Sequence, residues 1–240
     1  MSLLIIVPTY NEKDNIAELT KRIFDTAPSD TNLLIVDDNS PDGTGKLADD
    51  MASKDKRISV LHREKKEGIG KAYIEGFRYA LKNYDAEYFM GMDADLSHDP
   101  AFIPKFLEKI SSCDIVLGSR FYEGRVSIVN WPMIRLMLSY CASMYVRLCT
   151  GIPISDFTGG YRCFRRNVIE KIVETKAISS SYAFLIEINY VCYKLGFKIG
   201  EVPIIFYDRD KGASKMHTRK AVLEAMTIVW KLKFKNFKKD

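Results

Sequence analysis

Features that define several common protein classes are missing from this chain of 240 residues. Its five cysteines are an odd number and form no Cys-x-x-Cys pair, which argues against a disulfide framework or a zinc site. We therefore expect them to be core residues in a reducing compartment. The three histidines, His62, His98 and His217, accompany no serine or cysteine motif of the nucleophile-elbow type, so a hydrolytic triad has no support. No internal repeat is found.

Two familiar nucleotide-binding loops are incomplete. The segment Gly68-Ile69-Gly70-Lys71-Ala72-Tyr73 imitates a dinucleotide fingerprint, but its third glycine is absent and charged residues precede it instead of a strand. No Gly-x-x-x-x-Gly-Lys-Ser/Thr sequence occurs. The sequence thus disfavours both an NAD enzyme and a P-loop NTPase.

No apolar run reaches the length of a bilayer span, and the apolar run 3–7 is too short for a signal peptide. The net charge is +5, and residues 231–240 contain five lysines and one aspartate. This basic end predicts an anionic surface as its neighbour, or it is a solvated, frayed terminus. Nucleic acid is not an expected partner.

Short apolar runs rich in β-branched residues alternate with amphipathic segments in the first half of the chain. The predicted strands span residues 3–7, 33–36, 58–61, 88–92 and 115–117. Between them apolar residues keep helical spacing, as Ile16, Leu19 and Ile23 do. This rhythm predicts an α/β fold, with a mostly parallel, Rossmann-like central sheet and helices on both faces.

The second half of the chain follows a different pattern. Asn130-Trp131-Pro132 predicts the entry to a helix, since proline is tolerated in a first helical turn. Apolar residues then form one long stripe at helical spacing: Ile134, Met137, Leu138, Cys141, Tyr145 and Leu148. This stripe either packs into the core or lies in a membrane interface. A helix over 182–195, a strand over 198–207 with an irregularity at Pro203, and a last helix from about Thr218 complete the prediction.

Two carboxylates stand one residue apart where the fourth apolar run ends, in Asp93-Ala94-Asp95. Alternate side chains of a strand point the same way, so Asp93 and Asp95 should converge beyond the end of the sheet, where ligands bind in such folds. Hard divalent cations prefer oxygen ligands of this kind. A bound cation would neutralise a diphosphate leaving group. The alternative is a structural aspartate turn.

Several motifs together resemble the dolichyl-phosphate mannose synthases, in the inverting glycosyltransferase family with a GT-A fold. The resemblance covers about residues 3–215. Its motifs are Val7-Pro8-Thr9-Tyr10-Asn11-Glu12, Val36-Asp37-Asp38-Asn39-Ser40-Pro41-Asp42-Gly43-Thr44, Met92-Asp93-Ala94-Asp95-Leu96-Ser97-His98, Gly118-Ser119-Arg120 and Asp208-Arg209-Asp210-Lys211-Gly212-Ala213-Ser214-Lys215. It implies a catalytic domain over residues 1–215, followed by an amphipathic, basic helix or tail over 216–240.

The resemblance implies GDP-mannose as donor, dolichyl or another polyprenyl phosphate as acceptor, and Mg²⁺ or Mn²⁺ as cofactor. Positions that hold the donor match Pro8, Tyr10, Glu12, Val36, Asp38, Asp93, Ala94, Asp95, Arg120, Arg209 and Lys215. Catalysis is expected of Asp93, Asp95 and Arg120. The expected metal ligands are Asp95, Asp93 and Ser97; the short Ser97 side chain replaces a glutamine of some relatives, so water would complete the coordination.

The acceptor needs no general base, because a phosphate monoester is already anionic near neutral pH. Cations must instead bring two anions together. Arg135 and Ser139, four residues apart on a predicted helix, share a face, and the resemblance places acceptor-phosphate contacts there. Alternatively, Arg135 is an ordinary surface charge.

Other polar residues admit structural interpretations. His98 is expected to be a hydrogen-bonding loop residue rather than a metal ligand, Thr44 to cap a helix, and Asp156 to hold its loop through Arg162.

A lipid acceptor predicts a peripheral protein on the cytosolic face of a membrane, held by its amphipathic elements or by a separate anchoring subunit. Two rival functions stay open: transfer from UDP-glucose or another nucleotide sugar to polyprenyl phosphate or a glycan, and a non-catalytic nucleotide-sugar-binding subunit.

Overall fold

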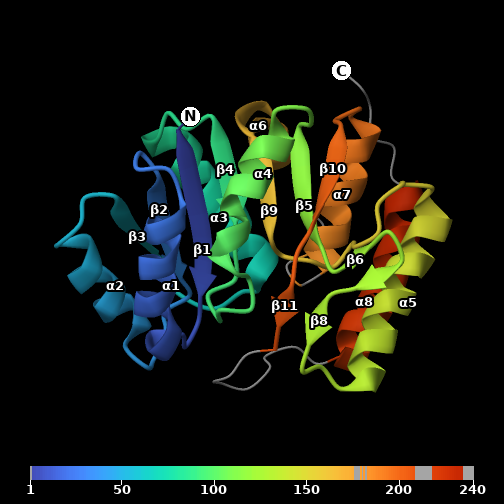
Figure 1. Cartoon of the computed structure of the whole chain (residues 1–240), viewed down its shortest axis with the longest axis horizontal. Coiled ribbons are helices and arrows are strands. Elements are labelled where there is room, and N and C mark those ends of the chain that lie inside the picture. Colours follow the sequence, from blue (N-terminus) through green and yellow to red (C-terminus); the bar gives the residue numbers. More distant parts are fainter. Residues whose placement is uncertain (1, 176–178, 180, 182, 209–217, 235–240) are drawn as a thin grey trace.

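The computed structural model describes residues 2–175, 179, 181, 183–208 and 218–234, and a seven-stranded sheet forms its centre (Figure 1). The strand order is β10-β5-β9-β4-β1-β2-β3. All neighbours are parallel except β9, which is antiparallel to β4 and β5. These strands are β1 (Leu3–Thr9), β2 (Asn32–Asp37), β3 (Ile58–His62), β4 (Tyr88–Gly91), β5 (Ile115–Ser119), β9 (Arg162–Arg165) and β10 (Ile199–Pro203). The predicted, mostly parallel sheet is confirmed.

Helices cover both faces of the sheet because its strands carry apolar side chains on both sides. Leu3, Ile5 and Val7 of β1 belong to one buried cluster, while Leu4 and Ile6 belong to another. The first cluster includes residues of α1 (Lys13–Thr26), α2 (Thr44–Ala52) and α4 (Ile103–Ile110). The second includes residues of α3 (Ile69–Asn83), α6 (Arg166–Glu174) and α7 (Ala183–Lys194). The predicted helices in these regions are confirmed.

Strand β9 was not predicted. It has only four residues and begins and ends with arginine, so its sequence contains no apolar run from which a strand could be predicted. Its register places Cys163 beside Met90 of β4 and Val116 of β5, in the middle of the sheet. The strand therefore separates β4 from β5, and brings the loop before it to the ends of both.

The predicted strand over residues 198–207 is in fact two strands in different sheets. β10 ends at Pro203, which has no backbone N–H to continue the ladder. β11 (Phe206–Tyr207) then pairs in parallel with β8 (Ile128–Val129). A further short pair is β6 (Phe121–Tyr122) with β7 (Arg125–Val126).

Helices α5 (Met133–Thr150) and α8 (Thr218–Phe234) pack against each other at one side of the sheet (Figure 1). Along the predicted apolar stripe of α5, Ile134, Met137 and Leu148 are exposed, whereas Tyr145 donates its hydroxyl to the Met226 carbonyl of α8, 3.4 Å away. Most of the stripe is thus surface, and core packing does not account for it.

The prediction that all five cysteines are core residues is wrong for Cys141, which is exposed on the outer face of α5. Cys113, Cys163 and Cys192 are buried, and all five are free thiols. Burial raises the pKa of the Cys163 and Cys192 thiols to about 12, which keeps them protonated and unreactive.

Among the described residues, no helix combines the length and the apolarity that crossing a membrane requires.

Candidate active site at the carboxyl ends of the strands

The loops that follow β1, β2, β4 and β5 lie at one edge of the sheet, the lower edge in Figure 1, because these four strands all run toward it. The Asp38 N–H donates to the Thr9 carbonyl over 3.0 Å, and the Gly118 N–H donates to the Tyr161 carbonyl over 2.9 Å. Pro8 and Val36 are register partners just before this edge. The edge therefore carries the candidate site.

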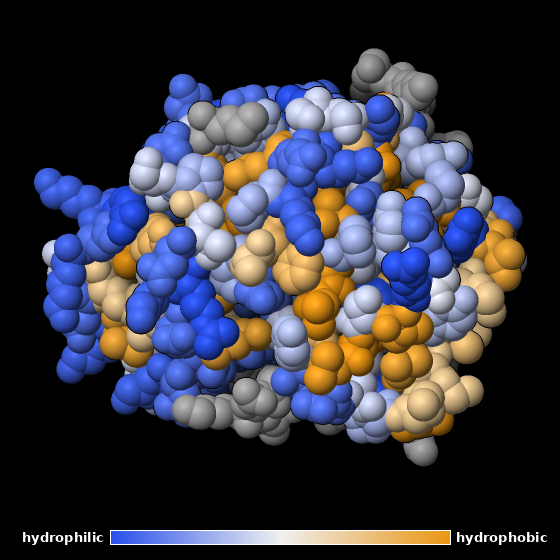
Figure 2. All heavy atoms as spheres, in the orientation of Figure 1, coloured by the Kyte–Doolittle hydropathy of each residue, from blue (hydrophilic) through white to orange (hydrophobic). Residues whose placement is uncertain are grey.

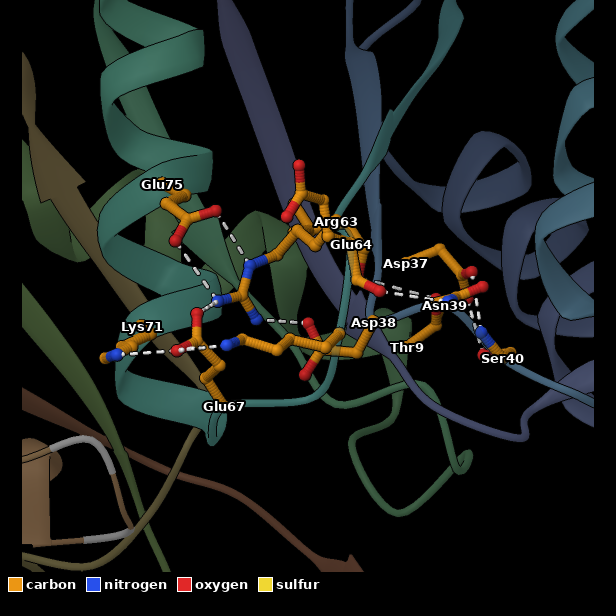
Figure 3. A network of polar contacts seen from close by, with 12 residues as sticks. Thr9, Asp37, Asp38, Asn39, Ser40, Arg63, Glu64, Glu67, Lys71 and Glu75 are labelled. Carbon is orange, nitrogen blue, oxygen red and sulfur yellow. Dashed lines mark hydrogen bonds and ion pairs between the residues drawn. The ribbon is translucent and has the colours of Figure 1, made fainter.

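Asp38 is held by a buried arginine that sequence reasoning missed. Arg63 follows β3, and its side chain is 2% exposed. Its Nη1 donates to Asp38 Oδ1, while Nε and Nη2 donate to the two oxygens of Glu75 over 2.8 and 3.1 Å (Figure 3). The one available signal was a charged residue two positions after the predicted strand over residues 58–61. Arg63 thus fixes the Asp38 carboxyl against α3.

Burial raises the pKa of Asp38, although the Arg63 guanidinium opposes that shift. The neighbouring Asp37 carboxylate accepts from the Thr9 hydroxyl over 3.0 Å and from the Ser40 hydroxyl over 2.6 Å (Figure 3). Its hydrogen bonds tie the ends of β1 and β2 together. The two neighbouring carboxyls thus differ in their partners: Asp37 accepts from hydroxyl groups, whereas Asp38 accepts from the Arg63 guanidinium.

Tyr10 and Glu12 lie in the loop that follows β1. The Lys66 ammonium is 4.0 Å from the centroid of the Tyr10 ring, a cation–π distance. The Glu12 N–H donates to the Thr44 hydroxyl over 2.9 Å. Tyr10 thus contacts Lys66, whose charge also acts on Asp38, while Glu12 contacts the first residue of α2.

The expectation that Thr44 caps α2 is wrong. Asp42 accepts hydrogen bonds from the Thr44 backbone N–H and hydroxyl over 2.9 and 2.6 Å. The Thr44 hydroxyl accepts from the Glu12 N–H of the loop after β1. The N-cap position of α2 is Gly43, and Asp42 accepts the first N–H of the helix.

The Asp-x-Asp turn is tightly organised. Asp95 Oδ1 accepts from the Ser97 hydroxyl over 2.6 Å and from the Ser97 N–H over 3.2 Å. The Asp93 N–H donates to His98 Nδ1 over 3.0 Å, which confirms His98 as a hydrogen-bonding loop residue. Because Nδ1 accepts this hydrogen bond, the ring proton is assigned to Nε2, and burial lowers the pKa of His98. Ala94 is buried between the two aspartates.

Oxygen donors at this turn fit a hard divalent cation. Asp93, Asp95 and Ser97 supply two carboxylates and one hydroxyl, the donor set that Mg²⁺ or Mn²⁺ accepts. A Cβ on Gly160 would lie 3.1 Å from Asp93 Oδ1, so glycine leaves room beside that carboxylate. In the described parts of the chain no cluster of three or more His, Cys, Asp or Glu side chains forms a complete metal site. The remaining ligands would come from substrate and water.

Arg120 is buried in an ion pair with Asp156. Its Nε is 2.6 Å from Asp156 Oδ2, its Nη2 is 2.8 Å from Oδ1, and the two side chains are 6% and 0% exposed. Burial would raise the pKa of Asp156, but the Arg120 guanidinium holds it below its usual value. The expectation that Asp156 acts through Arg162 is wrong, since the Arg162 side chain donates to the Gly159, Leu185 and Phe157 carbonyls and to Asn189.

The predicted pair on α5 lies beside Arg120. Ser139 Oγ is 3.4 Å from Thr158 Oγ1, and that hydroxyl accepts from Arg120 Nη2 over 2.7 Å. Arg135 Nη1 is 2.9 Å from Asp208 Oδ1, with the Arg135 side chain 19% exposed. Arg135 is therefore no ordinary surface charge. Arg209 and Lys215 lie outside the described residues.

Known proteins resemble this chain in sequence. The family model described as glycosyl transferase family 2 matches residues 4–173. The chain is 42% identical to an undecaprenyl-phosphate mannosyltransferase of Micrococcus luteus, over 90% of this chain and 88% of the relative. It is 41% identical to a polyprenol monophosphomannose synthase of Mycolicibacterium smegmatis, over 89% of this chain and 80% of that one.

Two solved structures are similar in fold. Glucosyl-3-phosphoglycerate synthase from Mycobacterium tuberculosis, in complex with Mn²⁺, UDP-glucose and phosphoglyceric acid, has a TM-score of 0.70 at 15% identity, covering 95% of this chain and 80% of that one. The mannosyltransferase PcManGT from Pyrobaculum calidifontis, in complex with GDP-Man and Mn²⁺, has a TM-score of 0.63 at 17% identity, covering 98% and 65%.

Proposed function

Because the chain belongs to glycosyl transferase family 2, as its motifs predicted, we propose that it transfers mannose from GDP-mannose to the phosphate of a polyprenyl phosphate. Its fold is the predicted GT-A fold. The names of the two relatives, an undecaprenyl-phosphate mannosyltransferase and a polyprenol monophosphomannose synthase, support the sugar and the lipid acceptor. The observation that carries the proposal is the meeting of the Asp93–Asp95 turn with a basic cluster, Arg120 and Arg135, at one sheet edge.

The donor side would be built from the loops after β1, β2 and β4. Tyr10 and Asp38 border the place for the nucleoside, with Asp38 positioned by Arg63. A divalent cation held by Asp95, together with Asp93 and Ser97, would neutralise the diphosphate as it leaves. Mg²⁺ and Mn²⁺ both suit these oxygen ligands.

The acceptor side would be built from α5 and the loop before β9. An oxygen of the acceptor phosphate attacks C1 of mannose, the bond from C1 to the diphosphate oxygen breaks, and the anomeric centre inverts. The phosphate is already anionic, so no side chain has to remove a proton. Arg120, Arg135 and the Ser139 hydroxyl would reduce the repulsion between the acceptor and donor anions.

A surface for the lipid lies next to this acceptor site. Apolar side chains gather over α5 at the right of the molecule (Figure 2). The most exposed are Met133 at 70%, Ile134 at 66% and Leu148 at 77%, while Phe234 of α8 is exposed at 80%. Patches of this kind mark interaction sites, and amphipathic helices insert such faces into a bilayer interface. We propose that this face rests on the cytosolic surface of a membrane, with or without a separate anchoring subunit.

The direct test incubates the purified protein with Mg²⁺ or Mn²⁺, a short-chain polyprenyl phosphate and radiolabelled GDP-mannose or UDP-glucose, and counts label in the organic phase. We expect label from GDP-mannose only. Label from UDP-glucose alone would correct the donor, and nucleotide binding without transfer to any acceptor would support a non-catalytic subunit.

A matched pair of variants tests the site. Asp95→Asn should abolish transfer, since it removes a carboxylate from the turn, whereas Asp55→Asn removes a partly exposed carboxylate in the loop between α2 and β3 and should leave transfer unchanged. Equal rates for the two variants would refute the assignment of Asp95.

A further inference from the structure

Trp131 stands between β8 and α5, next to the basic cluster, and its indole N–H is buried. Among the described residues, no side-chain or backbone atom accepts a hydrogen bond from its Nε1. A buried indole N–H ordinarily has a partner, and leaving such a donor unsatisfied is unfavourable. An isolated buried donor of this kind therefore requires an explanation.

Two cations surround the Trp131 ring. The Arg135 guanidinium carbon is 3.9 Å from its centroid, and that of Arg120 is 5.4 Å away. The ring of Phe206 meets it edge to face at 5.4 Å. The Trp131 ring thus lies within cation–π distance of both arginines to which the proposed function assigns the acceptor and donor phosphates.

The carboxylates nearby do not use this donor. Asp156 is occupied by Arg120 and the Thr158 N–H, and Asp208 Oδ1 pairs with Arg135. Neither accepts from the indole, which leaves this N–H available to an acceptor oxygen of a ligand. Two guanidinium groups beside an N–H donor select an anion with several acceptor oxygens, as a phosphate has.

Contact with Trp131 also constrains Arg135. An arginine side chain has many rotamers, and stacking on an aromatic face together with the bond to Asp208 limits them. The ring therefore serves Arg135 as a platform, while its N–H remains available. These two roles of one side chain can be separated by substitution.

We infer that Trp131 is a further acceptor-site residue, whose indole N–H donates to a non-reacting oxygen of the acceptor phosphate while its ring face positions Arg135. This inference rests on the proposed function for the identity of the acceptor, and it adds a neutral donor to the two cations. A neutral donor holds the phosphate without reducing the charge of the attacking oxygen as much as a third cation would.

The first test observes the donor directly. Protein labelled with ¹⁵N at tryptophan gives two indole N–H resonances, and the Trp230→Phe variant identifies that of Trp131. A short-chain prenyl phosphate should move the Trp131 resonance downfield, while the ³¹P signal of the ligand reports binding independently. Inorganic phosphate tests the headgroup alone, and GDP tests the donor diphosphate.

Movement with the prenyl phosphate and not with GDP supports the inference. No movement while the ³¹P signal shows binding would overturn it, and movement with GDP alone would assign the N–H to the donor instead. Absence of mannose transfer by the unchanged protein would refute the proposed function, yet the indole resonance would still decide about Trp131.

Kinetics provide the second test. Trp131→Phe keeps an aromatic ring and removes the N–H; loss of one hydrogen bond to a charged group should raise KM for the acceptor roughly 10- to 100-fold and leave KM for GDP-mannose unchanged. Tyr84→Phe is the matched control, because it also removes one donor from a ring, at the opposite end of α3 from the site, where the hydroxyl donates to Ser59. An acceptor KM equal to that of the control would contradict the assignment.

Discussion

Breaking the buried pair of Arg120 and Asp156 should destabilise the protein severely. In the Asp156→Asn variant the Arg120 guanidinium, 6% exposed, loses its carboxylate partner in a place where water cannot replace it. Removing one member of a buried ion pair costs about 3–5 kcal/mol of the free energy of unfolding. For a chain of this size each kcal/mol lowers Tm by about 2–4 °C, so we expect Tm to fall by roughly 6–20 °C.

The measurement is thermal and urea unfolding followed by circular dichroism. Asp55→Asn is the matched control, because the Asp55–Arg57 pair is 31% and 41% exposed. Exposed pairs contribute about 0–1 kcal/mol, so its Tm should stay close to that of the unchanged protein. The double variant Arg120→Met with Asp156→Leu removes both charges and should recover much of the stability without any transfer activity.

The same pair predicts how stability depends on pH. Arg120 lowers the pKa of Asp156 in the folded state, so the pair stabilises the protein above the unfolded pKa of about 3.9. That contribution is lost as the pH falls through the lower folded pKa. The difference in unfolding free energy between the unchanged protein and Asp156→Asn should therefore shrink in acid. A difference below about 1 kcal/mol at pH 7 would refute the reasoning, since buried pairs cost several times that to break.

Three further perturbations test the rest of the site. Arg63→Met should raise KM for GDP-mannose about tenfold with KM for the acceptor unchanged, because Asp38 loses a charged partner worth about 1.5–3 kcal/mol; equal changes in both constants would contradict this. His98→Ala should weaken Mn²⁺ binding about 10- to 100-fold, as loss of outer-shell support does; paramagnetic resonance of Mn²⁺ measures it, and unchanged affinity would argue against that role. Met137→Glu should weaken binding to anionic vesicles, measured by sedimentation, about tenfold, because the free energy of burying half a methionine side chain is of that order. Ser53→Glu should leave binding unchanged. Equal binding of the two variants would exclude α5 as the docking face.

The family, the sheet and the position of the site follow from sequence alone. Strands and helices of the first half are encoded by local apolar periodicity, and the carboxyl ends of parallel strands must share one edge. Asp93 and Asp95 could therefore be placed at that edge without coordinates, and the family resemblance added Asp38 to the same candidate site. The turn chemistry of Ser97 and His98 is local as well, since these residues lie within five positions of their partners.

Only the tertiary structure decided which charged side chains meet. Arg120 pairs with Asp156, 36 positions away in the sequence, and Arg63 pairs with Asp38, 25 positions away. Such pairings depend on strand order rather than on any local sequence pattern. The strand order of the sheet depends on β9, which lies between β4 and β5. This short strand contains no apolar run from which it could be predicted. The exposure of the α5 stripe was likewise decided by packing, because the same helical periodicity of apolar residues occurs on a face buried in the core and on an apolar surface face. Packing also buries the Trp131 N–H.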